Sequence, residues 1–295
     1  MEEWMELTAS AVRLATPVWI CALGAIWAER SGVVNIGLEG MMLTGAFWGA
    51  VGSFYAGAGW GILAAIAAGV LLSLLHAWVT VTCRVDQIVS GVAVNILAYG
   101  LTRFFCFRIF GMAGASPHID GLPKISFSSG SDFSWFVPLS LLLAALTWLV
   151  LQWTVFGLRL RSVGENPAAA DSLGINVIGC RYAGVLLSGA FAGLAGAYLA
   201  IEHTGMYVEG MTQGKGFIAL AAMIFGNWNP VGAMAAATLF GASEAVSFRV
   251  VDGKTIPYQF VRMIPYLFTL AALAGLRGKN RPPAAVGHPY SRSSA

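Results

Sequence analysis

Residues 59–82 read GWGILAAIAAGVLLSLLHAWVTVT and contain no Asp, Glu, Lys or Arg. A run of about 20 apolar residues, coiled into an α-helix, matches the ~30 Å hydrocarbon core of a bilayer. The run is too long and too evenly apolar for a barrel strand, whose signature is a weaker alternation. It therefore predicts a membrane-spanning helix.

Similar runs recur along the chain, at 8–28, 38–57, 86–109, 134–156, 182–201, 216–227, 230–248 and 259–276. Of the 295 residues, 57% are hydrophobic and 11% charged, whereas a soluble domain carries about 25% charged residues. Backbone polar groups in a bilayer must bond within the protein, which helices achieve. The predicted fold class is all-α, a polytopic transmembrane helical bundle of about eight or nine apolar segments.

Composition also excludes several functions. The net charge of +3 gives no sign of nucleic-acid binding. The four cysteines lie in or beside apolar runs without the paired spacing of a disulfide framework or zinc site, so they are expected to be small buried hydrophobic residues. The start, MEEWMEL, lacks the positive region and cleavage site of a signal peptide. We therefore expect the first span to be retained.

The domain organisation follows from the position of the polar segments. Residues 1–276 form one predicted transmembrane domain, and the tail 277–295, RGKNRPPAAVGHPYSRSSA, is expected to be disordered from its Pro, Ser and Arg content. Arginines also gather in the loop 157–181. Because positively charged short loops favour the cytoplasm, we expect this loop and the tail to be cytoplasmic and the N-terminus to be outside.

Two apolar segments are interrupted. Residues 31–57 are longer than one span and contain Gly32, Gly37 and Gly40, and residues 216–248 are divided by the polar run 226–230, GNWNP. Broken helices are tolerated in a membrane where they pack in protein or line a watery cavity, and paired interruptions are typical of transport sites. The second segment is compatible with two crossings or with one re-entrant hairpin.

The loop 157–181 contains a short helix with both of its stop signals. Asn166 suits the N-cap, Pro167 the first helical position and Gly174 a left-handed C-terminal cap. A helix this short is unstable alone, so it must lie against the membrane surface or a partner. These residues fit a capped interfacial turn and a helix that docks into an ATPase equally well.

Polar residues within the spans are candidate site residues. A carboxylate in a membrane indicates function by default, yet Glu39 also suits the first turn of a helix, where the dipole stabilises an anion. Polar residues between membrane helices often serve only as interhelical hydrogen bonds. The candidates for a path that accepts a polar, neutral substrate are Asn35, Glu39, Gln87, Ser90, Asn95 and Asn227.

Catalytic motifs do not stand out in the sequence. The closest match to a phosphate-binding loop is Gly253-Lys254-Thr255, but Phe248 occupies the position of the first glycine. The chain is therefore not expected to hydrolyse ATP, to bind a metal or to carry a cofactor.

The stretch 29–46, ERSGVVNIGLEGMMLTGA, closely resembles the permeases of bacterial ABC importers for nucleosides, within the family that also moves branched-chain amino acids and simple sugars. The resemblance extends to 86–102, DQIVSGVAVNILAYGLT, to 161–177, RSVGENPAAADSLGINV, and to 214–233, GKGFIALAAMIFGNWNPVGA. It covers most of the chain apart from the 110–133 loop and the tail.

This resemblance implies a type II-like importer permease in the bacterial plasma (inner) membrane. It also implies its partners: a second permease chain, a cytoplasmic ABC ATPase that uses ATP-Mg, and an extracytoplasmic substrate-binding lipoprotein. The short helix then becomes a coupling helix against the ATPase. Its residues are Gly164, Glu165, Asn166, Pro167, Ala169, Ala170, Asp171, Leu173 and Gly174.

Other function classes stay open. A permease for a simple sugar or a branched-chain amino acid would share the architecture. An ion-coupled secondary transporter could also use broken helices and intramembrane carboxylates, and it would need no ATPase. A membrane enzyme should show a cluster of His, Asp or Glu at one membrane face, which the sequence lacks. A structural membrane subunit without a pore is the simplest alternative.

Overall fold

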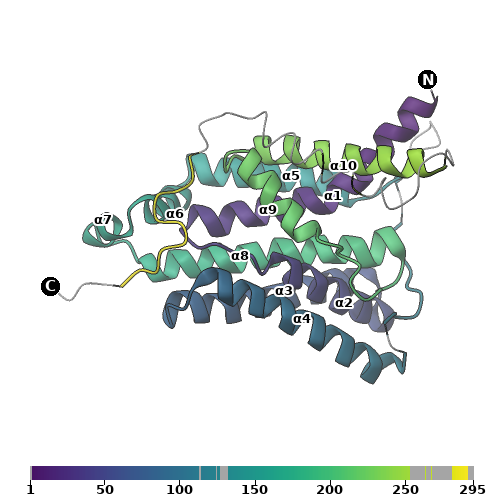
Figure 1. The fold of residues 1–295 in the computed structure, drawn as a ribbon, viewed down its shortest axis with the longest axis horizontal. Helices are drawn as coiled ribbons and strands as arrows, with labels where there is room; N and C mark the ends of the chain where they lie inside the picture. Colours follow the sequence, from purple (N-terminus) through teal and green to yellow (C-terminus); the bar gives the residue numbers. More distant parts are fainter. Residues whose placement is uncertain are drawn as a thin grey trace.

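The computed structural model is a bundle of long helices that run along a common axis (Figure 1). It describes residues 2–112, 114–123, 125–126, 132–252, 263, 267 and 281–291. The α-helices are α1 (Glu2–Arg30), α2 (Leu38–Ala56), α3 (Ala58–Ala77), α4 (Gln87–Phe110), α5 (Phe136–Trp153), α6 (Val155–Glu165), α7 (Pro167–Ser172), α8 (Val177–Ala197), α9 (Lys215–Phe225) and α10 (Pro230–Asp252). Two π-helical segments, η1 (Trp78–Thr82) and η2 (Tyr198–Thr204), extend α3 and α8. The strands β1 (Ile125–Ser126) and β2 (Asp132–Phe133) pair antiparallel.

Six helices of the described residues are long and apolar enough to cross a membrane: Trp4–Arg30, Ala58–Thr82, Gln87–Phe110, Phe136–Trp153, Val177–Thr204 and Pro230–Phe248. The predicted all-α membrane bundle is confirmed. The predicted run 216–227 is α9, whose 11 residues extend about 16 Å at 1.5 Å per residue, roughly half the bilayer core. It is therefore a half-helix that precedes the full crossing of α10. The predicted run 259–276 lies outside the described residues, apart from 263 and 267.

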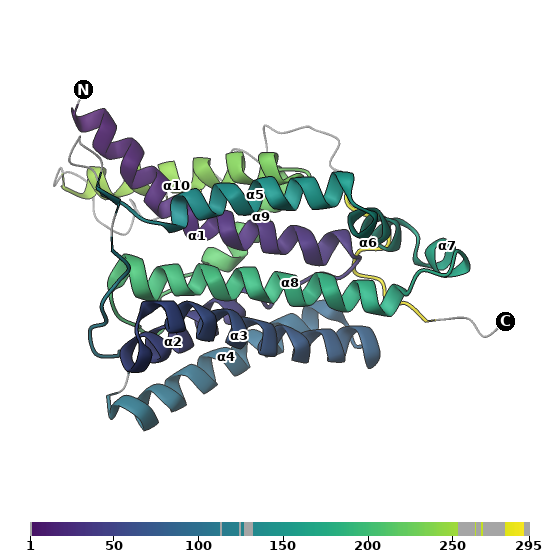
Figure 2. The ribbon, with the colours of Figure 1, turned by 180° about the vertical axis from the view of Figure 1, so that it is seen from behind.

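The centre of the bundle is α8, which lies between α1, α2 and α3 (Figure 2). Its contacts are close because the facing residues are small. A Cβ added to Gly45 of α2 would lie 2.5 Å from the Cα of Gly193, and a Cβ at Gly193 would overlap the carbonyl oxygen of Ala65 in α3. Small residues allow membrane helices to approach closely. Such close packing holds membrane helices together, because lipid supplies no hydrophobic force between them.

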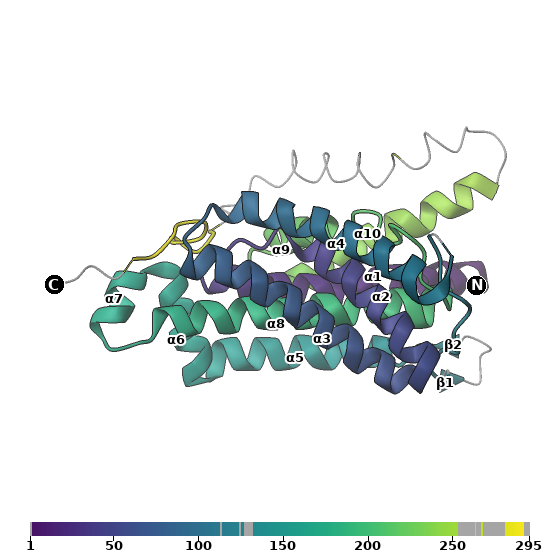
Figure 3. The ribbon, with the colours of Figure 1, turned by 90° about the horizontal axis from the view of Figure 1, so that it is seen from below.

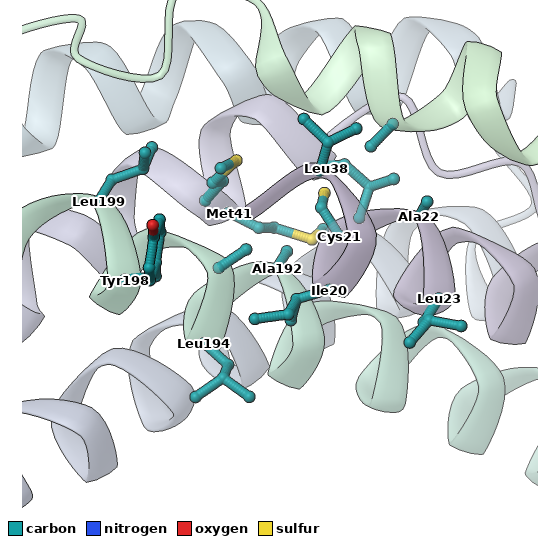
Figure 4. Packing of buried hydrophobic residues seen from close by; sticks show 14 of the residues in the cluster. Ile20, Cys21, Ala22, Leu23, Leu38, Met41, Ala192, Leu194, Tyr198 and Leu199 are labelled. Atoms are coloured by element: carbon teal, nitrogen blue, oxygen red, sulfur yellow. The ribbon is translucent and has the colours of Figure 1, made fainter. Parts of the chain in front are cut away.

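Apolar side chains fill the remaining space around this contact. Ile20 and Cys21 of α1, Leu38 and Met41 of α2 and Ala192 of α8 are buried together (Figure 4). In contrast, α3, α4 and α5 turn large apolar residues outward, including Leu71, Ile96 and Leu142. A bundle with an apolar interior and an apolar exterior suits a lipid surrounding.

The two ends of the bundle differ. Near the N-terminus, residues 114–119 pair with 205–209 through the bridge Ala115–Val208 and the hydrogen bond from Ser116 N to Tyr207 O at 2.9 Å. At the opposite end α6 and α7 project beyond the other helices (Figure 3); we call this the α7 end.

Residues 281–291, part of the tail expected to be disordered, lie against the α7 end. Ala285 N donates to Gly164 O at 2.9 Å, and Arg181 Nη1 donates to His288 O at 3.0 Å. Composition does not reveal such contacts, because they are made by the tail's backbone with residues far away in sequence. Residues 277–280 and 292–295 lie outside the described part of the chain.

The close contact of α8 can be tested by adding one methyl group. We expect Gly193→Ala to lower the melting temperature of the purified protein, because the methyl group would displace the α3 backbone. Gly100→Ala is the matched control: it also lies in a helix, and a Cβ there meets nothing within 4 Å. Equal melting temperatures for the two variants would contradict the close α3–α8 packing.

Candidate functional site

The chain between α1 and α2, residues 31–37, leaves backbone groups unpaired inside the bundle, and side chains of α4 bind them. Val34 N donates to Gln87 Oε1 at 2.6 Å. Asn95 Nδ2 donates to Ile36 O at 3.0 Å, and its Oδ1 accepts from Gly40 N at 2.8 Å. Because these backbone groups are buried, they must be satisfied by partners within the protein. Two of the predicted path residues thus fix the break.

The other side of this break is bound by residues of α3 and α8. Ser90 Oγ lies 2.9 Å from His76 Nδ1, and His76 Nε2 lies 3.2 Å from Val34 O. Since a carbonyl can only accept, we assign the proton to Nε2, and Nδ1 accepts from the serine hydroxyl. Asn35 Nδ2 donates to Ser188 Oγ at 3.0 Å. We call Asn35, His76, Gln87, Ser90, Asn95 and Ser188, all of which are buried, the break cluster.

Two amide atoms of the break cluster are buried and have no hydrogen-bond partner among the described residues, namely Asn35 Oδ1 and Gln87 Nε2. The oxygen of Asn35 is an acceptor, and the NH2 nitrogen of Gln87 is a donor. Leaving such an atom unsatisfied costs about 1–3 kcal/mol, so each would gain from contact with water or a polar solute. The cluster is neutral, and its chemistry suits a ligand that forms hydrogen bonds without charge.

Glu39 joins the starts of two helices. It lies in the first turn of α2, and its carboxylate accepts from Gly214 N at 2.8 Å and from Gly216 N at 2.7 Å, at the start of α9. The positive ends of both helix dipoles therefore stabilise the buried anion. The first-turn position was one of the two alternatives from the sequence, but the bond to a second helix 175 residues away was not foreseen.

A charged pair next to this contact ties α9 to α10. Lys215 Nζ lies 2.8 Å from both carboxylate oxygens of Glu244. Lys215 is buried, and Glu244 is partly exposed. Lys215 carries no periodicity signal of its own, since its partner lies one helix away.

Asn227 does not lie with the other predicted path residues. It occupies the exposed turn between α9 and α10 at the α7 end, where its Oδ1 accepts from Arg281 N at 2.9 Å. Asn227 and Trp228 both have left-handed backbones, with φ of 54° and 55°. Trp228 is held by its indole N–H, which donates to Glu29, and by its carbonyl, which accepts from Arg30 Nη2 at 3.0 Å.

The α6–α7 element has the local geometry that its sequence indicates. Asn166 Oδ1 accepts from Ala169 N at 3.0 Å, Pro167 begins α7, and Gly174 has a φ of 79°. Ala170 is buried against Val163 and Val177, whereas Leu173 is 80% exposed. An apolar side chain this exposed at a projecting tip (Figure 1) is available to a partner.

The remaining residues predicted for this element differ in their contacts and exposure. Gly164 packs directly against the end of α1, and a Cβ there would overlap the Arg30 carbonyl. Glu165 Oε2 accepts from Ala284 N at 3.3 Å. Ala169 is exposed and Asp171 partly exposed on the outer part of α7. Gly164 and Ala170 are buried, and the exposed members of the nine are Glu165, Asn166, Ala169, Leu173 and Gly174.

Metal chemistry gains no support from the described residues, among which no group of three or more His, Cys, Asp or Glu is placed to hold an ion.

The Glu39 contact predicts how substitutions there behave. Glu39→Ala leaves the amides at the start of α9 unpaired, and we expect it to destabilise the protein by about 1–3 kcal/mol, measured as denaturant-induced or thermal unfolding in detergent. Glu39→Gln keeps one carbonyl oxygen but places an NH2 group against the other amide, so we expect a similar or smaller loss. Asp120→Asn, in an exposed loop, is the control. A Glu39→Ala protein as stable as the control would contradict this role.

Comparisons with known proteins agree with this architecture. The family model described as the branched-chain amino acid transport system / permease component matches residues 7–273. The chain is 42% identical to the guanosine ABC transporter permease protein NupQ of Bacillus subtilis, over 94% of this chain and 93% of the relative. It is also 42% identical to the nucleoside ABC transporter permease protein NupC of Lactococcus lactis, over 97% of each.

Two further relatives are more distant. A putative glucose ABC transporter permease, TsgC13 of Haloferax volcanii, is 35% identical over 82% of this chain and 77% of its own. NupP, a second guanosine ABC transporter permease of B. subtilis, is 27% identical over 86% of this chain and 77% of its own. With six apolar helices among its described residues, the chain is a multi-pass inner-membrane protein, and it belongs to the family of branched-chain amino acid transport system permease components.

Proposed function

We propose that this chain is the membrane subunit of an ATP-driven importer and forms the translocation path for a nucleoside. The observation that carries this proposal is the 42% identity, over nearly the full length, to two permeases named for guanosine and nucleoside transport. The neutral break cluster supports it, because a nucleoside is uncharged and forms hydrogen bonds through its base and sugar. The individual roles of Asn35, Glu39, Gln87, Ser90 and Asn95 in the path stay predictions.

ATP hydrolysis is assigned to a partner. The sequence lacks a phosphate-binding loop, so we propose that a cytoplasmic ABC ATPase uses the ATP-Mg and that this chain has no catalytic activity. A second, similar permease completes the pore, and an extracytoplasmic binding lipoprotein delivers the substrate. The match to both NupQ and NupP, two guanosine permeases of one organism, supports a pair of unlike permeases.

We assign the ATPase contact to the α7 tip. The arginine-rich loop 157–181 predicts that the α7 end is cytoplasmic, and a helix of six residues requires a partner or a supporting surface. Closure of the ATPase dimer would move α7, and α6 would pass this movement to the end of α1 through the close contact at Gly164. ATP drives the change only through its different affinity for the two states.

The substrate is tested by uptake of radiolabelled nucleosides into cells that lack this chain and into cells in which it is restored. We expect nucleoside uptake to be lost and rescued, with no competition from sugars or branched-chain amino acids. Loss of sugar or amino acid uptake instead would keep the permease and remove the nucleoside. Uptake that collapses with an ion gradient but persists without ATP would contradict the importer and favour a secondary transporter.

The ATPase contact is tested at Leu173, whose exposed side chain can be changed without disturbing the fold. We expect Leu173→Glu to abolish co-purification of the ATPase and to reduce uptake at least tenfold, because the apolar contact becomes a buried charge. Val208→Glu, an exposed apolar position (39%) at the opposite end, is the matched control and should keep the ATPase bound. Gly164 is unsuited to this test, since a side chain there would disturb packing with α1. Normal ATPase binding by Leu173→Glu would refute the assignment.

A further inference from the structure

The segment 281–291, which we call the C-terminal strap, crosses the α7 end and contacts three elements that are remote in sequence (Figures 1 and 3). Its chain has little regular structure of its own. Even so, Pro283 and Ala285 are buried, so the strap is packed into the bundle end and does not merely lie on it.

The first contact is with the turn between α9 and α10. Arg281 N donates to Asn227 Oδ1 at 2.9 Å. Asn227 directly follows the last turn of α9, in a backbone with φ of 54°. The strap therefore holds the C-terminal end of the half-helix whose N-terminal end is bound by Glu39.

The second contact is with the end of α6, immediately before α7. Ala285 N donates to Gly164 O at 2.9 Å, and Ala284 N donates to Glu165 Oε2 at 3.3 Å. The last carbonyl groups of a helix have no partner within the helix, and Gly164 O is one of these. The strap thus supplies a C-terminal cap to α6 from a segment 121 residues further along the chain.

The third contact is with α8. Arg181 is 1% exposed, and its Nη1 donates to His288 O at 3.0 Å. Its Nε and Nη2 have no hydrogen-bond partner among the described residues, so the strap carbonyl is the acceptor that the structure provides for a buried guanidinium. Tyr290 adds an apolar contact to the cluster of Val163, Ala170 and Val177, which joins α6, α7 and α8.

We propose that the C-terminal strap is a positioning element that fixes α7 relative to the α9–α10 turn, so that displacement of α7 reaches the half-helix α9. Two routes then leave the α6–α7 element: one through Gly164 to α1, and one through the strap and Asn227 to α9, and from there to Glu39 and α2. The positioning of α7 follows from the contacts alone. Its part in transport rests on the proposed function, in which α7 receives the movement of the ATPase.

The test uses the full-length chain with single substitutions that remove one strap contact each. Asn227→Gly removes the acceptor for Arg281 N and keeps the left-handed backbone accessible, whereas Asn227→Asp retains an acceptor oxygen. Ala285→Pro removes the N–H that caps α6, whereas Ala285→Ser retains it. His288→Ala is a further control, because His288 contacts Arg181 through its backbone oxygen.

The first measurement is amide hydrogen exchange of residues 164–174 in the purified chain without the ATPase. We expect exchange to quicken about fivefold to tenfold in Asn227→Gly and in Ala285→Pro, the size expected for the loss of one hydrogen bond. It should stay near the wild-type rate in Asn227→Asp, Ala285→Ser and His288→Ala. Exchange in α3 should not change in any variant, which separates a local effect from general unfolding. Unchanged exchange of 164–174 in both contact-removing variants would overturn the proposal.

The second measurement is the number of substrate molecules taken up per ATP hydrolysed by the reconstituted complex. We expect this ratio to fall several-fold in Asn227→Gly and Ala285→Pro and to recover in Asn227→Asp and Ala285→Ser, while the ATPase remains bound. A ratio equal to wild type despite faster exchange would overturn the link from α7 to α9. If the proposed function itself fails, Leu173→Glu will not affect ATPase binding, and the exchange measurement still reports on the strap.

Discussion

The amide groups at the start of α9 lie inside the bundle, and the carboxylate of Glu39 satisfies them at 2.7–2.8 Å. A helix that begins within a membrane protein leaves its first N–H groups unpaired, and the bilayer has no water to replace the missing partners. One buried carboxylate in the first turn of α2 binds the amides of Gly214 and Gly216 at the start of α9, and the two helix dipoles stabilise its charge. This contact fixes the start of the half-helix, whereas the turn that follows it is held by Glu29, Arg30 and the strap.

The break between α1 and α2 follows the same rule with neutral groups. Gln87, Asn95 and His76 bind the backbone of residues 34–40. The helix that carries His76, α3, is held by the glycine contacts of α8, and α4, which carries Gln87 and Asn95, packs against α2. Close helix packing in the centre and the hydrogen bonds to the backbone at the break therefore support one another. A bundle built in this way has irregular backbone at its core without exposing it to lipid, which a path for a polar solute requires.

The α7 end combines features that a coupling element needs. A well-capped short helix projects from the bundle with an exposed leucine at its tip, and its base is joined to α1, α8 and the C-terminal strap. A rigid base and a free tip allow a partner to displace the element as a unit. The strap adds a second connection, from this base to the turn after α9.

The sequence by itself determined the all-α membrane bundle, the two interruptions and the caps of α7, because apolar run length, glycine and proline positions and capping residues act over a few neighbouring residues. It also identified Asn35, Glu39, Gln87, Ser90 and Asn95 as buried polar candidates. Only the tertiary structure decided what these residues bind, that α9 ends after 11 residues, that Lys215 pairs with Glu244 and that Asn227 meets the strap. The physical reason is that each of these contacts joins residues distant along the chain, whose approach is set by the packing of whole helices and leaves no periodic signal in the sequence.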